Sequence, residues 1–369
     1  MLANDAGRPI AGSGADLPIR LVVLFGGQSA EHDVSCTTAA HVLAAANNGH
    51  YEIVPIGITR QGAFVHAEAA IATLAGGARS LPGALEAAGP PAELLPTIRA
   101  LDPAQQVVVM PLLHGPLGED GTVQGMLELA GVPYVGSGVL GSALTMDKAK
   151  AKEVLAGAGV PQTRWRTILE GSWDQDLQPV IDDLGLPCFV KPANMGSSVG
   201  VSRASNEVEL SEAIALAFRY DEWVVIEEAV NAREIEFALL GNLDVSVSLP
   251  GEIVPGAEFY DYEDKYVAGK AQLIIPAVLD PVDTERMTEL AVVAYRALRC
   301  EGMARADFLF EEHGRGPLLN ELNTIPGFTP ISMYPKLWEA SGVSYPKLID
   351  ELVQLALERH QRRMAKRAG

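Results

Sequence analysis

The sequence predicts an α/β domain with a parallel sheet, followed by α+β subdomains built on antiparallel sheet. Apolar runs at 19–25, 51–58 and 107–113 alternate with helix-like stretches, and such alternation is typical of a parallel sheet. Beyond residue 187, short apolar runs follow one another at hairpin-like spacing, which favours antiparallel pairing. The 369 residues leave room for two or three domains.

The elements of the first domain are separated by glycine-containing turns. The run 19–25 ends at Gly26-Gly27 and leads into a helix-like stretch that continues to Leu43. The third apolar run also precedes a glycine-rich loop and a helix-like stretch. The segment 67–103 is rich in Ala, Gly and Pro, so it predicts variable helix and loop without chemistry.

The second half is predicted to open with one helix over about 142–158. Strand patterns recur at 187–191, 200–202, 223–227, 235–240, 245–249 and 272–276. Further helical patterns lie at 207–218, 281–300 and 345–366. The predicted divisions are a flexible tail at 1–18, an N-terminal α/β domain at 19–135, a central subdomain at 136–222 and a C-terminal subdomain at 223–369.

Composition excludes several classes of protein. The formal charge of −19 and the pI near 4.8 argue against a nucleic-acid partner, because phosphate backbones require clustered Lys and Arg. The three cysteines are widely spaced, so they indicate neither a disulfide framework nor a zinc site. No apolar run approaches the ~18 residues of a membrane helix. We therefore expect a cytoplasmic protein without a membrane partner.

The strongest candidate site combines two strand patterns near the C-terminus. Glu321 and Asn323 are two residues apart on one strand, so they share a face, and Asp307 lies on another strand near Arg305. Such hard oxygen ligands suit Mg²⁺, which is commonly held by one or two carboxylates together with substrate phosphates. The alternative is a solvent-facing edge of a half-buried sheet.

Basic residues supply a second candidate site. Lys191 ends a strand before a loop of Gly and Ser, where backbone N–H groups can approach phosphate oxygens. The alternative is an ordinary hairpin turn. Lys148 lies in a lysine-rich helical segment whose default interpretation is a solvated basic face.

Polar groups at other strand ends could bind further ligand atoms. Backbone groups that follow the strand ending in Glu227-Glu228 can form hydrogen bonds with the edge of an adenine ring. Glu234 can hold a ribose hydroxyl or simply pair with Arg233. Glu31 follows the first strand, where ligands of parallel sheets gather. It could hold a substrate ammonium or complement the dipole of the next helix.

Together these motifs closely resemble the D-alanine–D-alanine ligases of the ATP-grasp superfamily. The resemblance runs from about Leu21 to the C-terminal helix. It rests on seven motifs: Gly26-Gly27 with Ser29-Ala30-Glu31, His114-Gly115 with 118–122, Met146-Asp147-Lys148, Lys191-Pro192 with 196–200, Glu258–Tyr262 with Lys265-Tyr266, Arg305-Ala306-Asp307, and 320–324 with Pro326-Gly327.

The resemblance implies an ATP-grasp fold, in which an N-terminal parallel α/β domain is followed by two α+β subdomains that sandwich ATP. It also implies a lid loop at about 258–271, which would exclude water during reaction. Lys148 and Lys191 would contact the phosphates and Lys265 the γ-phosphate. The adenosine contacts implied are Glu227, Glu228, the Val230 backbone and Glu234. The ligands implied for two Mg²⁺ (or Mn²⁺) ions are Asp307, Glu321 and Asn323.

The same resemblance implies that two D-alanine molecules are joined for peptidoglycan precursor synthesis by a homodimer. Glu31 would fix the first ammonium with Ser197 and Tyr266, and His114 would line that site. Arg305 and the Gly327 N–H would meet the oxyanion. Ser332 and Met333 would hold the second carboxylate.

Two positions depart from the common family pattern: Met195, where many relatives carry Glu or Gln, and the lid stretch 267–270, which is short. Tyr266 favours an amine as second substrate over D-lactate. A D-serine-using ligase, an ATP-grasp enzyme for another substrate and a catalytically silent nucleotide-binding regulator are the alternatives.

Overall fold

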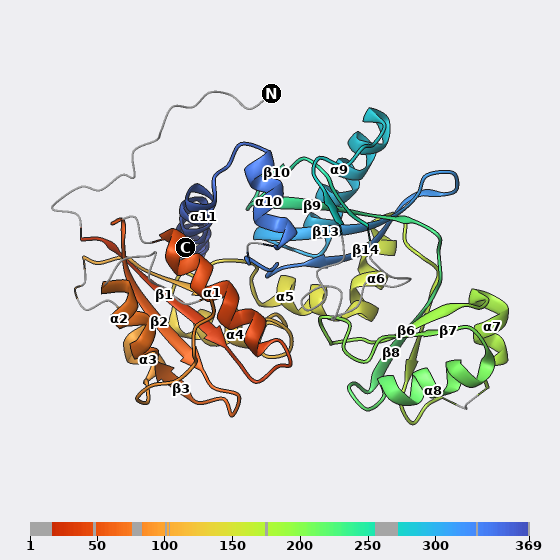
Figure 1. Cartoon of the computed structure of the whole chain (residues 1–369), viewed down its shortest axis with the longest axis horizontal. Coiled ribbons are helices and arrows are strands. Elements are labelled where there is room, and N and C mark those ends of the chain that lie inside the picture. Colours follow the sequence, from red (N-terminus) through yellow and green to blue (C-terminus); the bar gives the residue numbers. More distant parts are fainter. Residues whose placement is uncertain are drawn as a thin grey trace.

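The computed structural model describes residues 17–46, 49–75, 83–99, 102, 104–173, 176–254, 272–329 and 331–367. Its elements form three sheets with helices packed around them (Figure 1). Predicted lid residues Lys265 and Tyr266 lie outside the described residues. No helix within these ranges is both long enough and apolar enough to cross a membrane.

The first sheet confirms the predicted parallel α/β domain. Its order is β3-β2-β1-β4, and β1 pairs in parallel with both β2 and β4. The strands are β1 (Ile19–Gly26), β2 (Tyr51–Ile58), β3 (Phe64–His66) and β4 (Val107–Pro111), and the helices are α1 (His32–Ala46), α2 (Glu68–Ala75), α3 (Leu94–Thr97) and α4 (Thr122–Ala130). Every residue of β1 is buried because helices cover both faces of a parallel sheet.

The second sheet is antiparallel, in the order β5-β8-β6-β7. Its strands are β5 (Trp165–Leu169), β6 (Cys188–Pro192), β7 (Ser202–Ala204) and β8 (Trp223–Glu228), and its helices are α7 (Gln178–Leu184) and α8 (Glu207–Ala217). Val190 and Ile226 pack in one core with Leu210 of α8. Because side chains alternate along a strand, the neighbouring Lys191 points to the opposite face.

The third sheet has the order β12-β11-β9-β13-β14, with β10 paired to β9. Its strands are β9 (Arg233–Gly241), β10 (Val245–Val247), β11 (Gly251–Val254), β12 (Gln272–Ile274), β13 (Gly302–Glu311) and β14 (Gly316–Asn323). Phe237 and Phe308 bury one face against α9 (Pro281–Ala297) and α6 (Lys148–Gly157). The other face, by alternation, carries Glu236 and Asp307.

The predicted single helix over 142–158 is two helices. α5 (Val139–Met146) ends before Asp147, whose extended backbone (φ −78°, ψ 99°) breaks the helical path. The Asp147 side chain then accepts a hydrogen bond from the Lys150 N–H, so it caps α6. Lys148 is therefore the first residue of α6.

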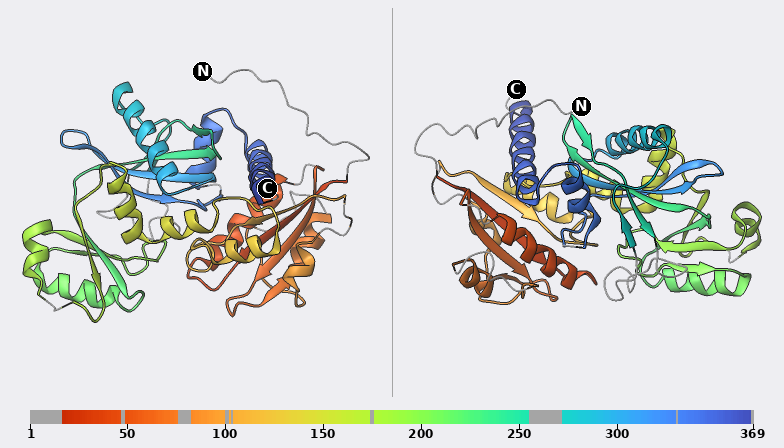
Figure 2. Two further views of the ribbon diagram at one scale, coloured as in Figure 1. Left: turned by 180° about the vertical axis from the view of Figure 1, so that it is seen from behind. Right: turned by 45° about the horizontal axis from the view of Figure 1, so that its top comes forward.

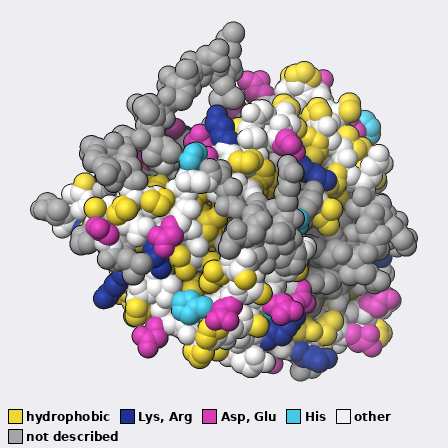
Figure 3. Space-filling model, turned by 60° about the vertical axis from the view of Figure 1, so that its left-hand side comes forward, with side chains coloured by type: hydrophobic (Ala, Val, Ile, Leu, Met, Phe, Trp, Pro, Cys, Tyr) yellow, Lys and Arg dark blue, Asp and Glu magenta, His cyan; other side chains and the backbone are white. Residues whose placement is uncertain are grey.

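The C-terminal helix joins the third sheet to the first domain. α11 (Tyr345–Arg367) follows α10 (Met333–Ala340) and lies beside α1 in one shared core (Figure 2). The buried Arg359 guanidinium stacks 4.2 Å from the Tyr134 ring centroid and donates to the Tyr134 carbonyl. On the face shown in Figure 3, acidic and basic side chains are interspersed.

Candidate active site

Two adjoining cavities bring together most of the described candidate residues. The larger, about 270 Å³, lies between the second and third sheets, and the smaller, about 110 Å³, continues toward Glu31 in the first domain. Five residues line both cavities: Glu119, Gly196, Ser197, Glu321 and Asn323. A ligand that enters one cavity therefore meets the wall of the other.

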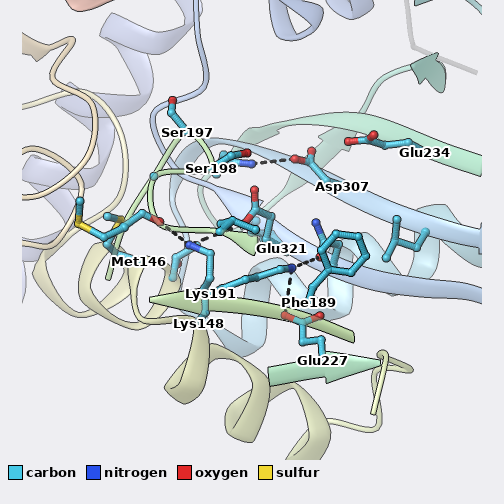
Figure 4. Close-up of a pocket in the computed structure, with 18 of the residues that line it drawn as sticks. Met146, Lys148, Phe189, Lys191, Ser197, Ser198, Glu227, Glu234, Asp307 and Glu321 are labelled. Carbon is cyan, nitrogen blue, oxygen red and sulfur yellow. Dashed lines mark hydrogen bonds and ion pairs between the residues drawn. The ribbon is translucent and has the colours of Figure 1, made fainter. Parts of the chain in front are cut away.

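Lys191 points into the larger cavity from β6 (Figure 4). Its Nζ lies 3.1 Å from Glu227 Oε1 and donates to Asn320 Oδ1 at 3.4 Å. Burial acts to lower the pKa of Lys191, but Glu227 and Glu321 outweigh it, so the net shift is upward. The lysine is held as a cation inside the cavity.

Lys148 reaches the same space from the first turn of α6. Its Nζ donates to the Met195 carbonyl at 2.6 Å and lies 4.0 Å from Glu321 Oε2. Met195, one of the departures from the family pattern, thus lines the cavity and supplies a backbone acceptor. The predicted solvated basic face is correct for Lys150, which is exposed, but not for Lys148.

Glu227 is a buried carboxylate with three cationic or hydroxyl partners. Besides Lys191, it has Lys152 Nζ 3.3 Å from Oε2, and Thr163 Oγ1 donates to Oε2 at 2.8 Å. Burial acts to raise the pKa of Glu227, but Lys152 and Lys191 lower it to about 2. Glu227 is therefore ionised and can only accept hydrogen bonds.

Lys152 was not singled out from the sequence. It is 2% exposed, and burial lowers its pKa although Glu227 acts in the opposite sense. Its spacing of four residues from Lys148 puts both on one face of a helix, which is the signal that could have found it.

Glu228 faces away from Glu227, as expected for neighbours on a strand. Its carboxylate pairs with Arg164 at 2.8 Å and Arg315 at 2.6 Å, although the residue also lines the larger cavity. Val230 and Glu234 line this cavity too. Arg233 pairs with Glu252 at 2.7 Å and with Glu312 at 3.2 Å, so these two carboxylates are its observed partners.

The predicted metal ligands converge on the wall between the cavities. Asp307 lies opposite Glu321 in the β13–β14 pair, and Asn323 Nδ2 donates to Asp307 Oδ2 at 2.9 Å. Two carboxylates and an amide are hard oxygen donors suited to Mg²⁺. Within the described ranges, no three Asp, Glu, His or Cys side chains are grouped to hold a metal by themselves. Substrate oxygens would have to complete the coordination.

Arg305 donates hydrogen bonds to both carboxylate oxygens of Asp307. Its Nε donates to Oδ1 and its Nη2 to Oδ2, both at 2.7 Å. The Arg305 Nε also lies 3.1 Å from Glu236 Oε2. Burial acts to lower the pKa of Arg305, but Asp307 and Glu236 raise it well above its usual value. Glu236, 1% exposed, is a second residue that the sequence did not single out.

Glu31 and Ser197 meet in the smaller cavity although 166 positions separate them. Ser197 Oγ donates to Glu31 Oε1. The backbone comes very close to this carboxylate: a Cβ at Gly196 would lie 2.6 Å from Glu31 Oε2, and one at Gly115 would lie 3.0 Å from it. A side chain at Gly196 would therefore have to displace the Glu31 carboxylate from its present position. The expected partner Tyr266 is outside the described residues.

Glu119 lies at the junction of the cavities and accepts from the Gly115 N–H at 2.7 Å. Burial, and then the charge of Glu31, raises its pKa to about 8. Nearby His114 is buried, and burial lowers its pKa although Glu31 opposes the shift. Glu119 stood within a motif, but its carboxylate was not assigned a role from the sequence.

Gly327, Ser332 and Met333 line the far side of the smaller cavity, as does Arg305. Ser332 precedes α10 and accepts the Thr329 N–H at 3.0 Å through its Oγ. The cavity thus ends at the start of a helix, which favours negative charge. The described candidate residues near all three sheets therefore line two adjoining cavities.

Two family models match nearly the whole chain. Residues 20–137 match the D-ala D-ala ligase N-terminus, and residues 154–354 match the D-ala D-ala ligase C-terminus. The chain is 46% identical over 345 residues to the D-alanine–D-alanine ligase of Deinococcus radiodurans, covering 92% of this chain and 98% of the relative. It is 44% identical over 351 residues to that of Bacillus cytotoxicus, covering 93% and 97%.

Solved structures resemble the fold along the same length. The D-alanine-D-alanine ligase of Coxiella burnetii has a TM-score of 0.79 at 35% identity, covering 94% of this chain and 96% of that one. The VanG D-Ala:D-Ser ligase of Enterococcus faecalis has a TM-score of 0.78 at 34% identity, covering 92% and 100%. The chain therefore belongs to the D-alanine–D-alanine ligase family and has its ATP-grasp fold.

Proposed function

We propose that the protein joins two D-alanine molecules to D-alanyl-D-alanine, using ATP and releasing ADP and phosphate. The observation that carries this proposal is the shared wall of the two cavities. One cavity presents lysines suited to phosphates, and the other presents carboxylates suited to an amino acid's ammonium. A phosphoryl group bound beside the shared residues can therefore be transferred to a substrate carboxylate in the smaller cavity.

ATP would occupy the larger cavity. Lys148 and Lys191 lie where they can contact its phosphates, and Lys265 would add a further charge from the lid. The ionised Glu227 can accept the adenine amino N–H, the backbone at Glu228 and Val230 borders the same site, and Glu234 can hold the ribose. The subdomains that enclose the nucleotide would be residues 136–222 and 223–369, after an N-terminal domain at 19–135.

Asp307, Glu321 and Asn323 would hold two Mg²⁺ (or Mn²⁺) ions together with phosphate oxygens. The ions supply charge neutralisation during phosphoryl transfer. For Asp307 this requires that its contacts with Arg305 and Asn323 loosen, because both of its oxygens are engaged.

The first D-alanine would bind in the smaller cavity. Glu31, oriented by Ser197, would accept its ammonium, with His114 beside it and Tyr266 closing from the lid. Its carboxylate oxygen would attack the γ-phosphorus, forming D-alanyl phosphate as ADP leaves. Exclusion of water by the lid protects this acyl phosphate from hydrolysis.

The amine of the second D-alanine would then attack the acyl carbonyl. A C–N bond forms, the C–O bond to phosphate breaks, and the developing oxyanion would be met by Arg305 and the Gly327 N–H. Ser332 and the backbone at Met333 would hold the second carboxylate at the start of α10. We assign the product to peptidoglycan precursor synthesis.

The test is ADP release by the purified protein with D-alanine, D-serine, D-lactate or L-alanine. We expect turnover with D-alanine alone, and mass spectrometry should identify D-alanyl-D-alanine. Turnover that requires D-serine beside D-alanine would identify a D-alanine–D-serine ligase, the activity named for the VanG relative. No turnover with any of these substrates would refute the proposal.

We propose a cytoplasmic homodimer, and sedimentation at assay concentration tests the oligomeric state. The three cysteines, all free and buried, suit a reducing compartment.

A further inference from the structure

A third carboxylate stands beside the proposed metal ligands and has no role in the reaction described so far. Glu236 on β9 lies directly opposite Asp307 on β13, and Asp307 lies opposite Glu321 on β14. The three acids therefore form one row across three strands. Glu236 is 1% exposed and lines the smaller cavity together with Arg305.

Arg305 contacts two carboxylates unequally, through hydrogen bonds to Asp307 and an ion pair with Glu236. It makes two contacts of 2.7 Å with Asp307 and one of 3.1 Å with Glu236. A cation on Asp307 would compete for the oxygens that Arg305 now occupies. Glu236 is outside the proposed metal-binding set, so it can remain with the arginine when Asp307 turns to the cation.

We propose that Glu236 is a positioning residue that holds Arg305 in the second-substrate cavity while Asp307 binds the metal. This inference rests on the proposed function, in which Arg305 meets the oxyanion. The Arg305 side chain is only 19% exposed, and a largely buried guanidinium without a carboxylate partner is disfavoured. Without Glu236, Arg305 would have to stay on Asp307 or lose its alignment with the reacting carbonyl.

The test separates the two chemical steps in the Glu236→Gln variant. Positional isotope exchange in ATP, measured with D-alanine, reports formation and return of the acyl phosphate, whereas dipeptide release reports both steps. We expect dipeptide release to fall about 30-fold while isotope exchange changes less than about threefold. Glu236→Asp, which keeps the charge, should recover part of the loss.

A binding measurement tests the exchange of partners without turnover. Mn²⁺ titration in the presence of a non-hydrolysable ATP analogue should show affinity weakened about threefold to tenfold in Glu236→Gln. The matched control is Glu252→Gln, which removes a carboxylate that pairs with Arg233 at 2.7 Å on neighbouring β11. This control should leave both rates and Mn²⁺ binding unchanged.

Equal losses in isotope exchange and dipeptide release would overturn the positioning role, as would wild-type rates. Unchanged Mn²⁺ affinity would overturn the exchange of partners. If Glu236→Gln does not fold at the assay temperature, the ratio of the two rates in Glu236→Asp decides in the same way. A wild-type protein that makes no dipeptide would instead refute the proposed function itself.

Discussion

Two glutamates that line the cavities have pKa values shifted in opposite directions. Glu227, in the larger cavity, has a pKa lowered to about 2 by Lys152 and Lys191, although burial opposes that shift. Glu119, at the junction with the smaller cavity, has a pKa raised to about 8 by burial and by Glu31. The difference comes from the charge of the neighbours, because burial acts on both carboxyls in the same direction.

This contrast follows the charges of the proposed ligands. A polyphosphate requires fixed cations, which the larger cavity supplies from α6 and β6. An amino acid's ammonium requires carboxylates, which the smaller cavity supplies from several elements. The wall shared by the cavities is where both requirements meet.

The largest effect should come from removing a cation from the larger cavity. Lys191→Met should lower kcat/KM for ATP about 1000-fold, because a preorganised charge at the phosphates is lost. D-alanine-dependent ADP release measures the effect. Lys150→Met is the control, since Lys150 is exposed and pairs only with Glu153 among the ion pairs described. A loss below tenfold for Lys191→Met would mean that Lys191 does not contact the phosphates.

The next effect should come from the shared wall. Asn323→Leu should lower Mg²⁺-dependent turnover about 100-fold because an oxygen donor is replaced by a similar apolar volume. Its melting temperature should stay within a few degrees of wild type. A collapse in melting temperature would mean that Asn323 is structural.

A smaller effect is expected from the substrate cavity. Glu31→Gln should raise KM for the first D-alanine about 30-fold, because a neutral amide binds an ammonium less strongly than a carboxylate does. KM for ATP should change little, since Glu31 does not line the larger cavity. A parallel rise in both KM values would contradict the assignment of ATP to the larger cavity and of the first D-alanine to the smaller one.

The smallest effect is a pH-dependent change in stability. The folded-state pKa of Glu119 is raised from 4.5 to about 8, so the folded protein binds more protons than the unfolded chain in this range, and stability falls as pH rises through it. Glu119→Gln removes this loss. Its melting temperature relative to wild type should be a few degrees higher at pH 8 than at pH 5.

The exposed Glu153→Gln variant is the control for that experiment and should show no such dependence. Glu227 contributes with the opposite sign, because its pKa is lowered: its stabilisation is present above about pH 4.5 and is lost toward pH 2. A difference for Glu119→Gln that is constant from pH 5 to 8 would contradict the raised pKa.

Much of the fold was predictable because it is local. The alternation of apolar runs and helices predicted the parallel sheet, and the helix at 345–366 closely matches α11 (Tyr345–Arg367). The break at Asp147 was missed, since Ala and Leu residues on both sides continue the helical pattern while a single capping side chain interrupts it. That break is what places Lys148 at the start of α6.

The sequence by itself determined which residues share a strand face, because side chains alternate with a period of two. Glu321 with Asn323, and Lys191 opposite its buried neighbours, follow from that rule alone. Only the tertiary structure decided that β9 lies beside β13, which sets Glu236 against Asp307 across 71 positions (307 − 236). Strand order and burial depend on distant parts of the chain, so the partners and pKa values of Glu119, Lys152 and Glu236 could not be read from their own segments.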